Sequence, residues 1–495
     1  MPSKEEELYQ ERLSKLHRLR ERDIDPYPAR YDRSHAATDA VQAFVSWEEA
    51  GSQGDAPRVS VGGRVTALRR MGKASFFDLQ DGSGRIQVFA QRDKLSDGDW
   101  ETLRDTDLGD FLGAEGPLFR TRAGEITVEA ASLTMLSKAL QTPPEKYHGL
   151  TDTEQRYRQR YRDLMANEET RELFILRSRV VSSMRRFLDG RGFIEVETPI
   201  LTDLAGGAAA RPFVTHHNVL ERDLYLRIAT ELYLKRLVVG GLDKVYEIGR
   251  VFRNEGLSWK HSPEYTMLES YEAYADYNDV MAMMEQMVAT IATETLGKTK
   301  IQAGDDDIDL TPPWRRLTMR QALIDFADLD IEHYRNIEDL KIRMTEMGIS
   351  PDPSAGWGKL IDQIASDLVE PKLIQPTFLI DYPLELSPLA KRKPEDSRYV
   401  ERFEAFAIGF ELGNAYSELN DPLEQRARFV EQALLRAAGD EETESIDEDF
   451  LVALEHGMPP TGGLGVGIDR LVMLLSGRLS IREVILFPTL RERQQ

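Results

Sequence analysis

Two runs of strand-forming residues around a polar loop constrain this chain more than any other feature. The first run spans residues 244–252, and the loop after it begins with Arg253. In the second run, aromatic and polar side chains recur at alternate positions: Tyr265, Met267, Glu269 and Tyr271. Two such runs predict an antiparallel hairpin, with Glu269 and Tyr271 on one face. A buried unpaired charge is costly, so this face suits the floor of a pocket for a flat ring and a cation.

Composition narrows the class of protein around this hairpin. The chain has 495 residues, 41% hydrophobic and 30% charged, which indicates a soluble protein of about three domains. No run approaches the roughly 20 apolar residues of a membrane helix, and the first residues lack a secretory signal. The absence of cysteine excludes disulfides and a thiol nucleophile, and fits a reducing cytoplasm. The net charge of −22 argues against indiscriminate coating of nucleic acid but allows a local basic face.

Shifts in residue pattern predict an α+β multidomain protein. Residues 58–136 contain short alternating runs separated by Gly, Asp and Ser turns, the pattern of a small antiparallel barrel of the OB-fold type. The expected organisation is a helical extension (1–57), the barrel (58–140), a linker (141–155), and a large domain (156–495) with a helical insertion (about 317–379).

The barrel carries a combination of side chains that suits unstacked RNA bases. Arg69, Phe76 and Gln87 fall on neighbouring runs joined by an Asp81-Gly-Ser-Gly hairpin turn. Aromatic rings stack on exposed bases, while amide and guanidinium groups read the base edges. The alternative is an ordinary barrel with a core phenylalanine and a surface arginine.

A group of acids near the C-terminal end suggests a metal site. Glu404 has an even and Glu411 an odd position number, so on one regular strand their side chains would point to opposite faces. Both face one ligand only if the strand breaks or bulges near Gly409. Asn414 and Glu418 share parity and therefore a face. Carboxylates beside substrate phosphates are typical Mg²⁺ ligands. The alternative is a set of solvated acids on an edge strand.

Three stretches, taken in order, resemble the signature motifs of the class II aminoacyl-tRNA synthetases. Residues 187–201 resemble the first motif, and the Phe252–Glu255 turn with the His261–Tyr265 segment resembles the second. The glycine-rich run 461–473, with Arg470, resembles the third and lacks the spacing of a P-loop or Rossmann motif. The barrel segments 71–76 and 84–87 resemble the anticodon-binding barrel of the lysyl branch of class IIb, bacterial type.

This resemblance implies a class II catalytic domain, an antiparallel sheet flanked by helices, that forms a homodimer through the first motif. It also implies a function: activation of L-lysine with ATP, then transfer to tRNA(Lys), whose anticodon would meet Arg69, Phe76 and Gln87. The implied lysine and catalytic roles are Arg253 at the carboxylate and α-phosphate, with Glu231 and Gly207 at the α-amino group. The implied ATP ligands are Asn254, Glu255, His261, Tyr265, Gly465 and Arg470, with Mg²⁺ held by Glu404 and Glu411.

The side chains of the pocket favour lysine over aspartate or asparagine as substrate. Glu269, Glu418 and Tyr271, with Asn414 nearby, offer acceptors for an ammonium, whereas an aspartate pocket needs a cation. Uncharged analogues should be rejected about 10⁴-fold, and ornithine by roughly 10–200-fold. The assignment fails if a guanidinium or ammonium of the protein fills the space between Glu269 and Glu418.

Two other functions fit parts of the sequence. A lysyl ligase that modifies a protein would resemble the catalytic domain but would leave residues 58–136 without a role. An RNA-binding regulator built on an inactive synthetase would not need Arg253, Glu255, Glu411 and Arg470, all of which are present.

Overall fold

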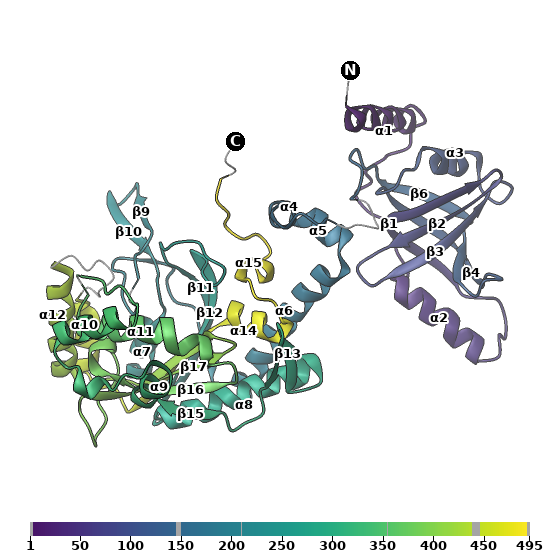
Figure 1. Ribbon diagram of the computed structural model, residues 1–495. Coiled ribbons are helices and arrows are strands. Elements are labelled where there is room, and N and C mark those ends of the chain that lie inside the picture. The colour runs from purple at the N-terminus through teal and green to yellow at the C-terminus, as the bar shows by residue number, and fades with distance from the viewer. Residues whose placement is uncertain (1–2, 145–149, 209, 354, 438–445, 493–495) are drawn as a thin grey trace. The chain divides into compact units, whose positions relative to one another are not determined.

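The computed structural model describes residues 3–144, 150–208, 210–353, 355–437 and 446–492. The chain divides into two compact units, Met1–Thr151 and Asp152–Gln495 (Figure 1). Among the described helices, none has the length and apolar character that crossing a lipid bilayer requires.

The first unit is a closed barrel, because β1 pairs with both β2 and β4 in the order β1-β2-β3-β5-β4. The expectation of an antiparallel barrel needs a correction, because β3 and β5 pair in parallel. Its strands are β1 (Arg58–Met71), β2 (Ala74–Gln80), β3 (Arg85–Gln91), β4 (Phe111–Arg120), β5 (Ile126–Glu129) and β6 (Ser132–Ser137), with α3 (Asp97–Asp105) between β3 and β4. The predicted turn joins β2 to β3, where the Asp81 carboxylate accepts hydrogen bonds from the backbone of Ser83 and Gly84. The expected OB-fold barrel is confirmed.

The N-terminal helices pack on this barrel. Leu19 of α1 (Lys4–Glu21) and Phe44 of α2 (Ala37–Glu49) belong to the same hydrophobic core as the barrel strands. The basic residues of α1 and Arg22, which follows the helix, are matched by acids: Lys15 pairs with Asp107 at 2.6 Å, and Arg18 and Arg22 pair with Asp105 at 2.6 and 2.7 Å. Much of the positive charge of α1 is therefore used within the unit.

The second unit is built on an eight-stranded sheet with the order β15-β16-β17-β18-β19-β12-β11-β7. Its strands are β7 (Ile194–Glu195), β11 (Lys244–Phe252), β12 (Glu264–Ala273), β15 (Arg315–Thr318), β16 (Thr377–Pro383), β17 (Tyr399–Ala407), β18 (Phe410–Ser417) and β19 (Thr461–Gly467). The predicted hairpin is β11–β12, which pair antiparallel along their whole length. The expectation of an antiparallel sheet needs a correction, because β15–β16 and β7–β11 pair in parallel at the two ends.

Two smaller sheets complete the strand inventory. One contains β8 (Leu201–Thr202), β9 (Val214–His217) and β10 (Arg222–Leu226), and the other contains β13 (Lys300–Ala303) and β14 (Asp306–Asp309).

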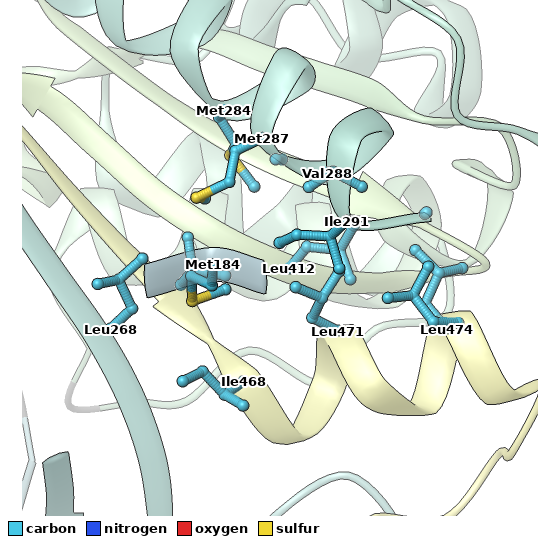
Figure 2. Close-up of a cluster of buried hydrophobic side chains, with 14 of the residues drawn as sticks. Met184, Leu268, Met284, Met287, Val288, Ile291, Leu412, Ile468, Leu471 and Leu474 are labelled. Carbon is cyan, nitrogen blue, oxygen red and sulfur yellow. The ribbon is translucent and has the colours of Figure 1, made fainter. Parts of the chain in front are cut away.

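One face of the large sheet carries the main hydrophobic core, formed with α6 (Glu168–Asp189), α8 (Tyr277–Leu296) and α14 (Ile468–Ser476). Figure 2 shows part of it: Met184, Leu268, Met284, Met287, Val288, Ile291, Leu412, Ile468, Leu471 and Leu474. Burying each such side chain contributes about 1.5–3 kcal/mol, so this face anchors the sheet firmly. Because side chains alternate along β12, the neighbours of Leu268 project from the opposite face.

The helical insertion lies between β15 and β16 in sequence and has a core of its own. Its elements are α9 (Met319–Ala327), η1 (Ile331–His333), α10 (Ile337–Glu346), α11 (Trp357–Ile364), η2 (Ala365–Val369) and η3 (Glu370–Lys372). The remaining helices of the unit are α4 (Thr153–Arg158), α5 (Arg160–Ala166), α7 (Glu231–Val239), α12 (Pro422–Ala437), α13 (Glu448–Glu455) and α15 (Ile481–Val484), and η4 (Leu384–Leu386) follows β16.

Candidate functional site

Two rows of residues cross three central strands on the sheet face opposite the main core. In one row, Gly465 of β19 pairs with Glu269 of β12 and with Asn414 of β18. In the next row, Gly463 pairs with Tyr271 and Tyr416. Polar side chains of β12 and β18 thus flank β19, which has only glycine, without a side chain, at these two positions.

The glycines of β19 leave the room that this arrangement needs. A Cβ atom on Gly463 would stand 1.9 Å from Oε1 of Glu418 and 2.6 Å from Cε1 of Tyr271. A Cβ on Gly465 would stand 2.9 Å from Cε of Met267. Both distances at Gly463 are far below van der Waals contact, so glycine there is a steric requirement of the pocket.

Three buried carboxylates gather at one end of the site. Glu231 is 6% exposed, Glu269 is 4% exposed, and Glu418 is 1% exposed. Burial and the negative charge of Glu231 raise the pKa of Glu269 to about 7. This end of the site is acidic and shielded from water, which suits a ligand with amino groups.

Glu269 is held by donors from two elements. Its Oε1 accepts from the backbone N–H of Thr230 at 3.2 Å, and its Oε2 accepts from the Tyr271 hydroxyl at 3.3 Å. Thr230 occupies the N-cap position of α7, but its side chain makes no capping hydrogen bond to the helix.

A cation that the sequence analysis did not consider lies among these acids. The side chain of Lys235, on α7, is completely buried, and its Nζ lies 2.5 Å from Oε1 of Glu231 and contacts Oε2 of Glu418. Within the described part of the chain, no ion pair joins Lys235 to Glu269. The hydrogen-bond donors to Glu269 are the backbone of Thr230 and the hydroxyl of Tyr271. Glu418 is therefore already paired, while the space beside Glu269 is not bridged by this ammonium.

Gly207 lies against the same acidic cluster. Its φ of +84° is in the left-handed region that favours glycine, and a Cβ there would stand 3.2 Å from Cβ of Glu231. The backbone at Gly207 thus lies close to Glu231, the residue with which the family resemblance pairs it.

The other end of the site is basic. Cζ of Arg253 lies 5.6 Å from the centre of the Tyr265 ring, and its Nε donates to the Ile228 carbonyl at 3.4 Å. Arg470, on α14, donates from Nη1 to the carbonyl and to Oε2 of Glu411 at 3.1 and 2.9 Å. These guanidinium groups are suited to carboxylate and phosphate oxygens.

His261 belongs to this basic end as a neutral ring. Its Nδ1 lies 2.9 Å from Oγ of Ser258, and burial with the nearby charges of Arg470 and Lys260 lowers the pKa of His261 to about 4. Two loop residues of the expected ATP set are exposed. The backbone N–H of Asn254 donates to the Arg211 carbonyl at 2.8 Å, and Glu255 contributes a negative charge near Arg253.

The acids predicted to hold a metal lie on a hairpin with the expected irregularity. The chain reverses between β17 and β18 at Ile408 and Gly409, which have φ of 48° and 76°, and the pairing register shifts after Ala405. The predicted break between Glu404 and Glu411 is confirmed.

In this structure each of these two acids has an arginine partner. Arg402 donates to Glu404 at 2.6 Å, and the Tyr382 hydroxyl donates to the same carboxylate at 2.9 Å. Burial, reinforced by the charge of Glu411, nevertheless raises the pKa of Glu404 to about 8. Among the described residues, no cluster of three or more Asp, Glu, His or Cys side chains forms a metal site. Two carboxylates fit Mg²⁺ only if substrate phosphates supply the other ligands, as this ion prefers.

Comparison with known proteins identifies the family. Residues 152–491 match the family model described as tRNA synthetases class II (D, K and N), and residues 59–136 match an OB-fold nucleic acid binding domain. The chain is 54% identical to a lysine–tRNA ligase of Dehalococcoides mccartyi, over 99% of this chain and 98% of the relative. It is 52% identical to that of Moorella thermoacetica, over 99% of both chains, and 49% identical to that of Bacillus subtilis, over 98% and 97%. This chain belongs to the lysine–tRNA ligase family.

The barrel of this family member brings its predicted base-binding residues to one face. Arg69 lies opposite Phe76 on β1 and β2, and Phe76 lies opposite Phe89 on β3, with ring centres 4.5 Å apart. Gln87 has the same parity as Phe89, and its Oε1 accepts from the Thr127 hydroxyl at 3.0 Å. Phe89 was not among the predicted residues, although its position two residues after Gln87 on the same strand was a usable signal.

Three other polar residues of this ligase-family site were missed. Lys235 follows Glu231 by one helical turn, the spacing at which side chains meet on a helix. Tyr416 lies between Asn414 and Glu418 with the same parity, and its hydroxyl donates to Glu231 at 2.6 Å. Arg402 shares parity with Glu404 on β17. Each was accessible to the same periodicity argument that found its neighbours.

Proposed function

We propose that the protein is a lysine–tRNA ligase, which joins L-lysine to ATP as lysyl-adenylate with release of pyrophosphate. The lysyl group then passes to the 3′ end of tRNA(Lys). The observation that carries the proposal is the polarity of the site: three buried carboxylates at one end and Arg253 with Arg470 at the other. A ligand with two amines near one end and a carboxylate beside a triphosphate at the other matches this distribution of charge.

The amine end selects the substrate. Glu269, Glu418, Tyr271 and Asn414 receive the side-chain ammonium, while Glu231 and the backbone of Gly207 hold the α-amino group. The close approach of Gly207 to Glu231 supports the second assignment. A buried carboxylate left without a cation costs several kcal/mol, so substrates without a terminal amine bind poorly.

The arginine end performs the chemistry by position and charge. Arg253 holds the lysine carboxylate and the α-phosphate together, so that a carboxylate oxygen attacks the α-phosphorus and the bond to pyrophosphate breaks. The carboxylate is already ionised at neutral pH, so no general base is needed. Catalysis comes from orientation and from stabilisation of negative charge in the transition state.

ATP occupies the surface beside Arg253. Tyr265 stacks on the adenine, Asn254 and Glu255 read its edge, and Gly465 lets the backbone approach the nucleotide. His261 and Arg470 take the outer phosphates; with the pKa of His261 near 4, its ring acts as a neutral hydrogen-bonding group. Glu404 and Glu411 would hold Mg²⁺, which would supply further positive charge to the phosphates. In this structure Arg402 and Arg470 pair with these two acids.

The remaining parts supply the macromolecular partners. The barrel binds the anticodon of tRNA(Lys) with Arg69, Phe76 and Gln87. A second copy of the chain covers the first-motif region, where Ile194, Ile200 and Leu201 are 46–49% exposed. Apolar side chains exposed in one region support such an interface. The absence of cysteine is consistent with a cytoplasmic enzyme.

The test is amino-acid-dependent exchange of pyrophosphate into ATP across the twenty amino acids, followed by charging of tRNA(Lys). We expect lysine to be the one amino acid that supports exchange, and we expect lysine to become attached to tRNA(Lys). Exchange without tRNA charging, but with lysine transferred to a protein, would favour the protein-modifying ligase. Absence of exchange with any amino acid would favour the inactive RNA-binding protein.

A further inference from the structure

Lys235 has no role in the mechanism above, yet it lies inside the amine end of the site. Its side chain is 0% exposed, and its ammonium contacts one oxygen of Glu231 and one of Glu418. The rings of Tyr416 and Phe450 lie 5.5 and 5.8 Å from Nζ. A cation this deeply buried is stable only because carboxylates and aromatic faces surround it.

Counting charges suggests what this ammonium does. Glu231, Glu269 and Glu418 carry three negative charges when all are ionised, whereas lysine brings two ammonium groups. The carboxylate of lysine is matched by Arg253. One of the three glutamates therefore has no counterpart in the substrate, and Lys235 supplies the missing positive charge.

The geometry of the ion pairs leaves room for the substrate. Lys235 contacts Oε1 of Glu231 and Oε2 of Glu418, which is one oxygen of each carboxylate. A carboxylate accepts hydrogen bonds through both oxygens, so each glutamate can bind Lys235 and a substrate amine together. The resident ammonium thus need not leave when lysine enters.

We propose that Lys235 is a positioning residue for lysine recognition, whose buried ammonium holds Glu231 and Glu418 in place and favours the charged form of Glu418 while their other oxygens bind the substrate. This inference rests on the proposed lysine site. With Lys235 present, the filled pocket is electrically neutral, and burial of an uncompensated charge is avoided.

Removal of Lys235 should appear in the pH dependence of lysine binding. The titratable groups that face it are Glu231 from its own helix, Tyr416 from β18 and Glu418 beyond it, with Glu269 and Tyr271 from β12 on the far side of the cluster. Without the ammonium, Glu231 and Glu418 lose the positive charge that they share and keep the negative charges of one another and of Glu269 as neighbours. Like charges that cannot all ionise retain protons to higher pH.

The experiment is pyrophosphate exchange with Lys235→Met between pH 6 and 8.5, measuring KM for lysine and for ATP. For the wild type we expect KM for lysine to level off above about pH 7. For the variant we expect KM to be raised at least about tenfold at pH 7 and to recover toward pH 8.5, with KM for ATP little changed. Lys244→Met is the matched control, because it removes a lysine–glutamate pair with Glu272 outside the pocket. A pH profile of Lys235→Met that runs parallel to the wild type would overturn the proposal.

A second variant covers the case in which the first does not fold. Lys235→Met with Glu418→Gln removes one charge of each sign, so the pH midpoint of lysine KM should return to that of the wild type. The value of KM for lysine should nevertheless stay raised, because Glu418→Gln removes a carboxylate that binds the substrate amine. If the double variant does not fold, or if the pH midpoint of its KM for lysine is more alkaline than that of the wild type, Lys235 does not act by balancing the charge of Glu418.

Glu269→Gln separates failure of this inference from failure of the proposed site. If Glu269→Gln leaves KM for lysine unchanged, the lysine site itself is misassigned. If it raises KM for lysine while Lys235→Met has a wild-type pH profile, the site stands and only the role of Lys235 is wrong.

Discussion

Gly463 of β19 lies directly opposite Tyr271 of β12, and a single methyl group on Gly463 would come within 2.6 Å of the tyrosine ring and 1.9 Å of the Glu418 carboxylate. The absence of a side chain at one position therefore leaves room over β19 for a polar group from β12 and for one that follows β18. The size of the amine pocket depends on this glycine as much as on the acids around it.

Gly463→Ala should narrow the pocket. Overpacking of a buried site costs about 1–3 kcal/mol, so we expect KM for lysine to rise about 5- to 150-fold in pyrophosphate exchange, with a smaller change for ATP. Gly356→Ala is the control, because a Cβ at Gly356 would meet no atom within 4 Å. An unchanged KM for lysine would show that the substrate does not pass between Tyr271 and Glu418.

The pH dependence of lysine binding should report the ionisation of Glu269. Because the pKa of Glu269 is raised to about 7 in the free protein, the carboxyl is increasingly protonated below that pH and loses its attraction for an ammonium. We expect KM for lysine to rise about tenfold per pH unit below pH 7 and to be flat above it. Glu269→Gln should raise KM for lysine more than KM for ATP and abolish this dependence. Equal effects on both substrates would argue against Glu269 as the ammonium partner.

Arg253→Ala should abolish lysine-dependent pyrophosphate exchange. Removing a group that stabilises charge in the transition state costs roughly 10³-fold in rate. Arg320→Ala is a suitable control, since Arg320 pairs with Asp330 on the helical insertion. Near-normal exchange by Arg253→Ala would refute the role assigned to it.

Phe76→Ala should separate the two substrates of the reaction. Stacking of a base on an aromatic ring is worth about 1–3 kcal/mol, so we expect KM for tRNA(Lys) to rise about 5- to 150-fold in charging assays. Pyrophosphate exchange without tRNA should be unaffected, because Phe76 belongs to the barrel and the lysine site belongs to the other compact unit. A loss of exchange would indicate that the substitution unfolds the protein rather than weakening RNA binding.

Periodicity in the sequence predicted the features that depend on a single element or hairpin. The shared face of Glu269 and Tyr271 and the break between Glu404 and Glu411 follow from strand alternation, and both are present. The pairing of Lys235 with Glu418 joins a helix to a segment far along the chain. No local pattern fixes which elements pack together, so contacts of this kind required the structure.

Thr230 shows a second limit of local reasoning. It stands at the N-cap position of α7, and its backbone N–H donates to Glu269 on β12. Both residues are buried, and a buried carboxylate without donors is costly. This hydrogen bond depends on how α7 packs against β12, which the local sequence does not specify.

The position of β19 has a consequence for how the protein is made. It is the last strand in the described part of the chain, yet it lies between β12 and β18, so that without it the large sheet would separate into two halves. A nascent polypeptide in which β19, from Thr461 onward, has not yet left the ribosome therefore lacks a continuous sheet. It also lacks the strand that underlies the lysine site. Partly synthesised or prematurely terminated copies that lack β19 should therefore be inert.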